Sequence, residues 1–195
     1  VATGDNYSDP PSKTSDAIVA MDLKTGAFLW SRQLLENDAF TNGCLTPQPV
    51  NCPEAKGPDH DFGQPPVLVE LGGQNRALVI AQKSGMVHAV DPDKKGAILW
   101  QTPDPQASKN PGFVTAANGV VYAGSAAGSG GNMCALDAAT RTVLWSFASG
   151  GSVFSAPAVV HGMLFWGSGY TRNAACPNGF NSCVANDKLF AFGLP

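Results

Sequence analysis

Short hydrophobic segments that alternate with polar positions, several of them ending at an aspartate, run through the chain. In three places such a segment is followed by a polar turn and a second apolar segment ending in tryptophan, at residues 20–30, 89–100 and 135–145. Alternation is typical of half-buried strands, and aspartate with glycine favours the tight turn between two antiparallel strands. Each unit is therefore predicted to be a β-hairpin, and a degenerate fourth unit begins at Lys188.

The three hairpins are copies of one repeat. The second copy has one inserted residue, and the third has Arg141 where the first has Gly26. Trp100 and Trp145 lie 45 residues apart, which fits the ~40–50-residue period of a four-stranded propeller blade. Two more apolar segments precede each later hairpin and supply the other strands, at residues 66–71 and 76–81, 112–117 and 120–124, and 155–160 and 163–167.

The predicted fold class is all-β: a partial β-propeller of four-stranded antiparallel blades. We expect a half blade at 1–36, a disulfide loop at 37–60, and blades at about 61–103, 111–148 and 152–193. Propellers close with about four to eight blades, so roughly three and a half cannot close at the usual rotation. The remaining blades are therefore expected from a longer chain, with self-association as the alternative.

Composition narrows the function classes. Lys and Arg number 12 against 15 Asp and Glu, which gives a net charge of −3 and no positive field for nucleic acid. The 22 glycines and 15 prolines break helices and disfavour long-helix folds. No apolar run approaches the ~18 residues of a membrane-spanning helix. We therefore expect neither a nucleic-acid partner nor a membrane span.

Four of the five cysteines form two close pairs in loops. Cys44 and Cys52 are 8 residues apart, and Cys176 and Cys183 are 7 apart. Neither pair has the tight spacing of a zinc site, so two loop-closing disulfides are predicted, with unpaired thiols as the alternative. Disulfides indicate an oxidising compartment, and the predicted location is periplasmic or secreted.

The repeat Ala-x-Asp-x-x-Thr-Gly-x-x-x-Trp resembles the tryptophan-docking motif of quinoprotein propellers. The segments between the repeats, at residues 3–7, 57–63 and 81–85, follow an order similar to that of quinoprotein alcohol dehydrogenases, nearest to the polyvinyl-alcohol dehydrogenase branch. The resemblance implies pyrroloquinoline quinone and Ca²⁺ as cofactors and primary, secondary or polymeric alcohols as substrates. It also implies a cytochrome c as the electron acceptor.

The same resemblance implies roles for four residues. Asp61 matches the family's catalytic base beside calcium, and a carboxylate suits proton removal from an alcohol. Asp5 or Asn6 matches the family's calcium ligand, and both offer the oxygen that Ca²⁺ prefers. Lys83 lies where the family carries a cation near the quinone oxygens. The alternatives are that the carboxylates and Asn6 shape turns and that Lys83 is a solvated charge.

Two other functions compete with the dehydrogenase. The chain could be part of a non-catalytic quinoprotein-like propeller that acts as a protein-binding scaffold, in which case Asp5, Asn6, Asp61 and Lys83 need not converge. It could also be a polymer-binding β-module, which would expose its repeat tryptophans side by side as an aromatic platform. The positions of these side chains distinguish the three hypotheses.

Overall fold

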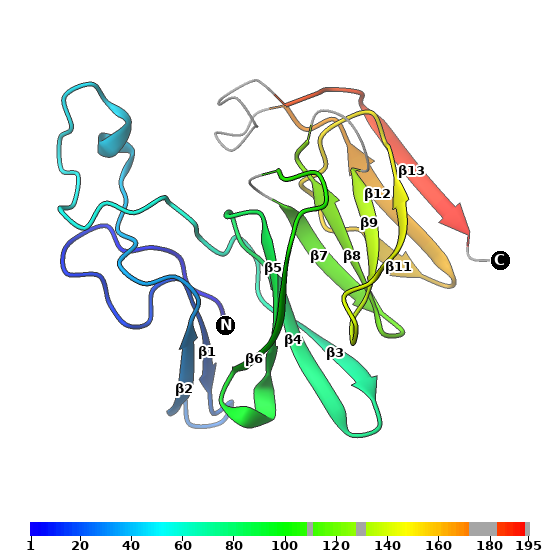
Figure 1. The fold of residues 1–195 in the computed structure, drawn as a ribbon, viewed down its shortest axis with the longest axis horizontal. Coiled ribbons are helices and arrows are strands. Elements are labelled where there is room, and N and C mark those ends of the chain that lie inside the picture. The colour runs from blue at the N-terminus through cyan, green and yellow to red at the C-terminus, as the bar shows by residue number, and fades with distance from the viewer. Residues whose placement is uncertain (109–110, 128–131, 172–182, 194–195) are drawn as a thin grey trace.

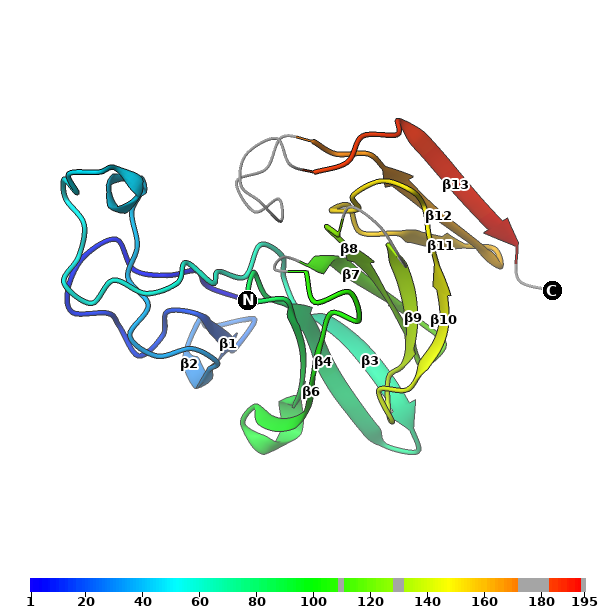
Figure 2. The same ribbon diagram turned by 45° about the horizontal axis from the view of Figure 1, so that its top comes forward.

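Four antiparallel sheets follow one another side by side in an open arc (Figure 1). The computed structural model describes residues 1–108, 111–127, 132–171 and 183–193. The chain enters at a two-stranded sheet of β1 (Ala17–Met21) and β2 (Phe28–Gln33) and then builds two four-stranded meanders. Figure 2 shows the fan of sheets ending at β13. The prediction of an all-β, partial propeller with four-stranded antiparallel blades is confirmed.

The sheets are built from strands that neighbour one another in sequence. The first complete sheet contains β3 (Val67–Gly72), β4 (Asn75–Ala81), β5 (Met86–Asp91) and β6 (Ala97–Pro103). The second contains β7 (Pro111–Ala117), β8 (Val120–Ser125), β9 (Met133–Asp137) and β10 (Val143–Phe147). The described part of the last sheet contains β11 (Ala158–Val160), β12 (Met163–Ser168) and β13 (Lys188–Gly193).

The repeat aspartates shape the hairpin turns. Asp22 accepts hydrogen bonds from the amides of Lys24 and Thr25, and Asp137 does the same in the third copy. Each turn ends on a residue with a left-handed backbone, at Gly26 with φ +71° and at Arg141 with φ +61°. The arginine therefore adopts the conformation that glycine takes at lower steric cost.

Each repeat tryptophan packs against the next sheet. Trp30 approaches so closely that a Cβ on Gly96 would lie 2.8 Å from its ring. Trp100 is buried and donates a hydrogen bond of 2.8 Å from Nε1 to the carbonyl oxygen of Ala138. Trp145 lies in an aromatic cluster with Phe147, Trp166, Phe190 and Phe192. The tryptophans thus join sheets and form no surface platform, which removes the argument for a polymer-binding module.

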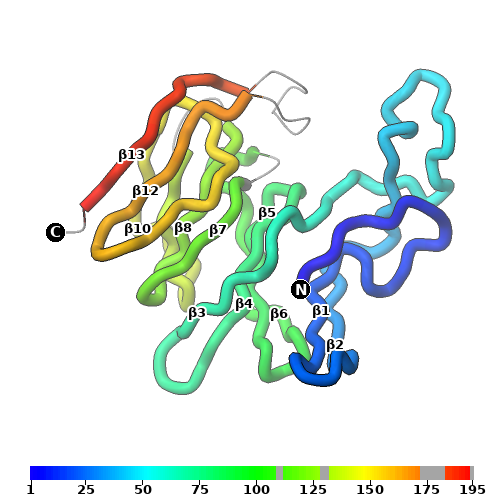
Figure 3. Tube along the Cα trace, turned by 180° about the vertical axis from the view of Figure 1, so that it is seen from behind, coloured from blue at the N-terminus to red at the C-terminus, as the bar shows by residue number. Residues whose placement is uncertain are grey.

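A loop over residues 37–60 projects from the β1–β2 end of the arc (Figure 3). It contains the short 3₁₀ helix η1 (Asn42–Leu45) and the predicted disulfide, Cys44–Cys52. A parallel bridge of Ala39 with Asn6 ties the loop to the N-terminal segment, and a second, with Lys56, joins the two sides of the loop. The second predicted disulfide includes Cys176, which lies outside the described residues. A second 3₁₀ helix, η2 (Pro92–Lys94), forms the β5–β6 turn, and among the described residues no helix is long and apolar enough to cross a membrane.

Candidate functional site

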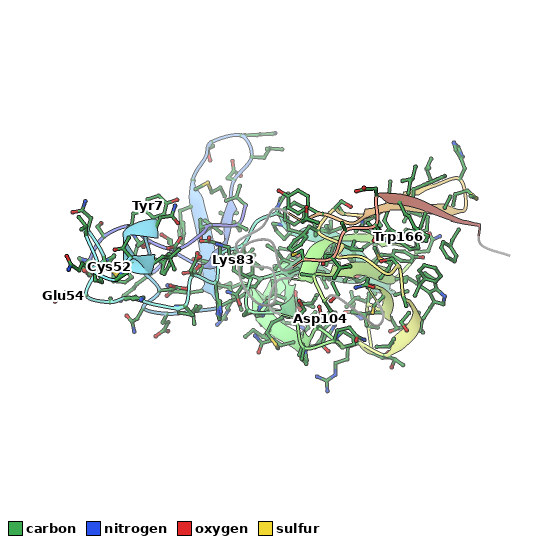
Figure 4. The ribbon with its side chains drawn as sticks, turned by 90° about the horizontal axis from the view of Figure 1, so that it is seen from above. Tyr7, Cys52, Glu54, Lys83, Asp104 and Trp166 are labelled. Atoms are coloured by element: carbon green, nitrogen blue, oxygen red, sulfur yellow. A yellow bond between two sulfur atoms is a disulfide. The ribbon has the colours of Figure 1, made fainter. Side chains whose placement is uncertain are left out.

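Three of the four predicted site residues meet at one end of the sheets. Asp61 lies in the loop before β3, Lys83 in the turn between β4 and β5, and Asp5 in the N-terminal segment. Lys83 Nζ is 2.6 Å from Asp61 Oδ2, and the Asp5 amide donates a hydrogen bond of 2.8 Å to Asp61 Oδ1. Figure 4 shows Lys83 between the sheets and the N-terminal part that carries Tyr7. Segments that are distant in sequence therefore supply one cluster.

Close backbone packing holds Asp61 in place. A Cβ at Gly4 would lie only 2.5 Å from Asp61 Oδ1, so a larger residue there would displace the carboxylate. The Lys83 amide donates a hydrogen bond of 3.0 Å to the Asp61 carbonyl oxygen. Asp61 is thus fixed through both its backbone and its side chain, which is the preorganisation that a catalytic or binding group requires.

A second aspartate, Asp59, completes the cluster. Lys83 Nζ lies 2.7 Å from Asp59 Oδ1, so the ammonium bridges two carboxylates. Asp59 has a left-handed backbone, with φ +62°. The fully buried Asp38 accepts hydrogen bonds from the amides of Asp59 (3.2 Å) and His60 (2.9 Å) and so stabilises this turn. Asp38 therefore shapes the loop that presents Asp59 and Asp61.

Asn6 does not join the cluster. Its Oδ1 accepts a hydrogen bond of 2.8 Å from the Ser12 amide and shapes the N-terminal loop. Of the two candidates for a calcium ligand, Asp5 is the one whose carboxylate faces Asp61. Sequence reasoning missed the contributions of Asp38 and Asp16, because neither lies in a motif and both are buried by tertiary packing.

Negative charge is concentrated around Asp5. Burial, together with the hydrogen bond and charge of Asp61, raises the pKa of Asp5 to about 7. Burial also raises the pKa of Asp61, but hydrogen bonds from Asp5 and Lys83 outweigh it and bring that pKa down to about 2. Asp16 is fully buried, and burial with the charge of Asp38 raises its pKa to about 8. Crowded carboxylates of this kind compete for protons or for a cation.

The donor set fits a hard divalent cation. Oxygens of Asp5, Asp59 and Asp61 lie within 4.8 Å of one another, a spacing compatible with Ca²⁺–oxygen bonds of about 2.3–2.6 Å. Asp5 Oδ2 is buried and has no hydrogen-bond partner among the described residues. A buried carboxylate oxygen without a donor is costly, and a bound cation would satisfy it. The residues present therefore suit the calcium that the family resemblance implies.

The cluster forms a wall shared by two cavities. One, of about 680 Å³, is bounded by aromatic side chains beyond the carboxylates, and the other, of about 460 Å³, opens toward the disulfide loop at residues 40–42. Asp5, Tyr7, Asp61 and Lys83 line both. The aromatic walls of the larger cavity come from β7 and from three loops: Phe113, and Phe62, Phe154 and Tyr170. Such a wall suits a flat conjugated ligand.

Known proteins resemble this chain over substantial lengths. Residues 83–175 match the family described as outer membrane protein assembly factor BamB. A polyvinylalcohol dehydrogenase of Sphingopyxis sp. (strain 113P3) is 35% identical over 193 residues, covering 86% of this chain and 30% of that protein. A polyvinylalcohol dehydrogenase of Pseudomonas sp. is 40% identical over 100 residues, covering 51% of this chain and 15% of that protein.

Among solved structures, a quinohemoprotein alcohol dehydrogenase from Pseudomonas putida HK5 aligns with a TM-score of 0.43 and 24% identity. That alignment covers 53% of this chain and 16% of the other. The chain spans less than a third of the length of the curated relatives it matches.

The stacked antiparallel sheets, each joined to the next by a repeat tryptophan, define the class of fold as a partial β-propeller of four-stranded antiparallel blades. Within that class the resemblance indicated by the motifs is confirmed. The chain is similar to part of the quinoprotein alcohol dehydrogenases, and specifically to the polyvinylalcohol dehydrogenase branch.

Proposed function

We propose that the chain is part of an alcohol dehydrogenase that uses pyrroloquinoline quinone and Ca²⁺. The observation that carries this proposal is the convergence of Asp5, Asp61 and Lys83 on one cavity from three separate segments. Asp5 and Asp61 would hold the calcium ion, with Asp59 within reach, and Asn6 shapes the adjacent loop.

The chain's own residues would bind the reactants and move one proton. When bound in the cavity, the quinone would supply a hydride acceptor and calcium would supply Lewis acidity. Asp61 is ionised at neutral pH because its pKa is about 2, so its carboxylate has the charge state needed to accept the hydroxyl proton of the alcohol. Lys83 remains charged because its hydrogen bonds with Asp59 and Asp61 raise its pKa in spite of burial. Its ammonium would stabilise negative charge on ligand oxygens.

The relatives and the disulfide support the proposed substrate class and location. The two matched proteins are named polyvinylalcohol dehydrogenases, which supports secondary or polymeric alcohols as the substrate class. A cytochrome c is the proposed electron acceptor. The Cys44–Cys52 disulfide supports an oxidising location, periplasmic or secreted. Further blades from a longer chain would complete the ring and the remaining cofactor contacts.

Reconstitution of the full-length protein tests the proposal. Incubated with pyrroloquinoline quinone and Ca²⁺, it should take up quinone and reduce a dye when an alcohol is supplied. Uptake is measured by fluorescence and turnover by dye bleaching. A full-length protein that does neither would overturn the dehydrogenase and favour the protein-binding scaffold, to which the match of residues 83–175 with an assembly factor also points.

The variant Asp61→Asn gives the sharper test. The amide keeps the size of the side chain and one oxygen but is a very weak base, so turnover should fall by about 10²- to 10⁴-fold. Quinone uptake should persist, because the aromatic walls of the larger cavity and Lys83 are unchanged. Equal loss of uptake and turnover would assign Asp61 to binding alone.

A further inference from the structure

The side chain of Gln82 occupies an unusual position at the wall of the larger cavity. Gln82 follows β4 directly, lies next to Lys83, and is only 4% exposed. Its Nε2 is buried and has no hydrogen-bond partner within the part of the chain that the structure describes. Buried donors without acceptors are rare in folded proteins and call for a specific explanation.

Contacts with Ser84 and His88 fix the orientation of the Gln82 amide. Its Oε1 accepts a hydrogen bond of 2.8 Å from Ser84 Oγ and lies 3.2 Å from His88 Nε2. Ser84 Oγ in turn accepts from the Met86 amide at 3.3 Å, which leaves the hydroxyl proton for Gln82. This network assigns Oε1 to the protein interior and leaves Nε2 as the atom without a partner.

His88 is consistent with that assignment. It is 2% exposed, and its Nδ1 lies 2.8 Å from Gln101 Nε2, so Gln101 donates to Nδ1 and the Nε2–H of His88 donates to Gln82. Burial lowers the pKa of His88 to about 4, and a neutral imidazole has the one N–H that this chain of hydrogen bonds uses.

The same cavity wall has a second polar atom without a partner, Asp5 Oδ2. A donor at Gln82 and an acceptor at Asp5, with the Lys83 ammonium beside them, would be satisfied together by a bound cation and a ligand oxygen. We propose that the Gln82 Nε2–H₂ group donates a hydrogen bond to an oxygen of the ligand in this cavity, either a quinone oxygen or the hydroxyl oxygen of the alcohol. This inference rests on the proposed function.

Two substitutions in the full-length protein remove the donor. Gln82→Glu keeps an oxygen for Ser84 and His88, and Gln82→Met keeps the shape without adding charge. Loss of one hydrogen bond should weaken the affected ligand about three- to tenfold. Fluorescence titration with pyrroloquinoline quinone measures the quinone without turnover, and KM for the alcohol at saturating quinone measures the substrate. The titration that changes in both variants identifies the oxygen.

Gln64 provides a matched control. It is also a buried glutamine whose Nε2 lacks a partner among the described residues, while its Oε1 accepts from the Val114 amide, but it does not line the cavity. Gln64→Met should leave both titrations unchanged. If the wild type takes up quinone and oxidises alcohol while folded Gln82 variants match it in both titrations, the role of Gln82 is overturned and the proposed function stands. If the wild type does neither, the proposed function fails, and the ligand assigned to Gln82 fails with it.

Discussion

Asp5 shows how one more carboxylate changes the chemistry of the candidate site. Its side chain adds a second carboxylate next to Asp61. Without a cation the two groups crowd each other, which contributes to raising the pKa of Asp5 to about 7. A proton and a divalent ion therefore compete for the same oxygens.

We expect calcium affinity to rise with pH up to about 7. Below that value Asp5 is protonated, and each binding event must release a proton, so affinity should fall by up to about tenfold per pH unit. Calorimetric titrations of the full-length protein with Ca²⁺ between pH 5.5 and 8, in buffers of different ionisation enthalpy, measure both quantities. Asp5→Asn should flatten the dependence, and a wild-type profile that is already flat would contradict the shared proton.

Asp16 allows a prediction about stability. Its side chain is completely buried, and neither carboxylate oxygen has a hydrogen-bond partner among the described residues. Its folded pKa of about 8 lies above the unfolded value of about 3.9. The proton therefore favours the folded state, and stability is lost as pH rises from about 4 to 8.

Asp16→Asn should remove this loss. The amide cannot ionise, so the variant should be more stable than the wild type at pH 8, by about 1 kcal/mol or more, and the difference should shrink toward pH 5. Urea unfolding at the two pH values measures it. A constant difference between the proteins at both pH values would show that Asp16 is ionised in the folded state.

Residue types in a motif could be identified from sequence, but buried partners could not. Asp5, Asp61 and Lys83 were selected because flanking motifs stand in a family order, and the structure brings them together; their roles stay predictions. No sequence motif indicates Asp38, because its role depends on the amides of Asp59 and His60, which are 21 and 22 residues away. Contacts between irregular loops leave no periodic signal in the sequence.

At the scale of elements, the repeat tryptophans hold one sheet to the next. Trp100 on β6 reaches Ala138 at the β9–β10 turn, and both residues are buried. The indole N–H satisfies a carbonyl oxygen that no water reaches. The sheets are therefore linked by a specific hydrogen bond as well as by apolar area.

Trp100→Phe should show how much that hydrogen bond contributes to the free energy of unfolding. Phenylalanine retains most of the apolar contact but leaves the Ala138 carbonyl unsatisfied, so the free energy of unfolding should fall by about 1–3 kcal/mol. Trp30→Phe is the control, because Trp30 is only partly buried where it packs on Gly96, and its loss should be smaller. Chemical denaturation followed by tryptophan fluorescence compares the two variants. Equal losses would mean that area alone accounts for the docking.

Strands were predictable where turn chemistry and alternation agree. The segment expected at residues 76–81 is β4 (Asn75–Ala81), and the hairpin turns follow from Asp22 and Asp137. The loop at residues 37–60 was predictable only as a disulfide loop. Its 3₁₀ turn and its parallel bridge between Ala39 and Asn6 depend on pairing with the distant N-terminal segment, which local propensity does not encode.

At the scale of the molecule, the described residues leave one apolar face of the last sheet uncovered. Along β13 the side chains of Phe190 and Phe192 pack into the aromatic cluster, so by strand alternation Leu189 points to the opposite face. Val160 of β11 is also exposed. In a closed propeller each sheet lies between two others, and this face is suited to another sheet.

The segment 1–195, expressed by itself, should therefore self-associate through the face that contains Leu189. Burial of exposed apolar area drives such association, and a lysine in its centre opposes it. Leu189→Lys should shift the segment toward the monomer in sedimentation velocity at concentrations up to ~100 μM. Leu23→Lys is the matched control: Leu23 is 100% exposed against 76% for Leu189, but it lies in the β1–β2 turn and not on a sheet face. If exposure alone decided association, the control would have the larger effect. If the sheet face drives association, Leu189→Lys has the larger effect of the two variants. In the full-length protein Leu189→Lys should also lower stability, because the next sheet would then cover the charge.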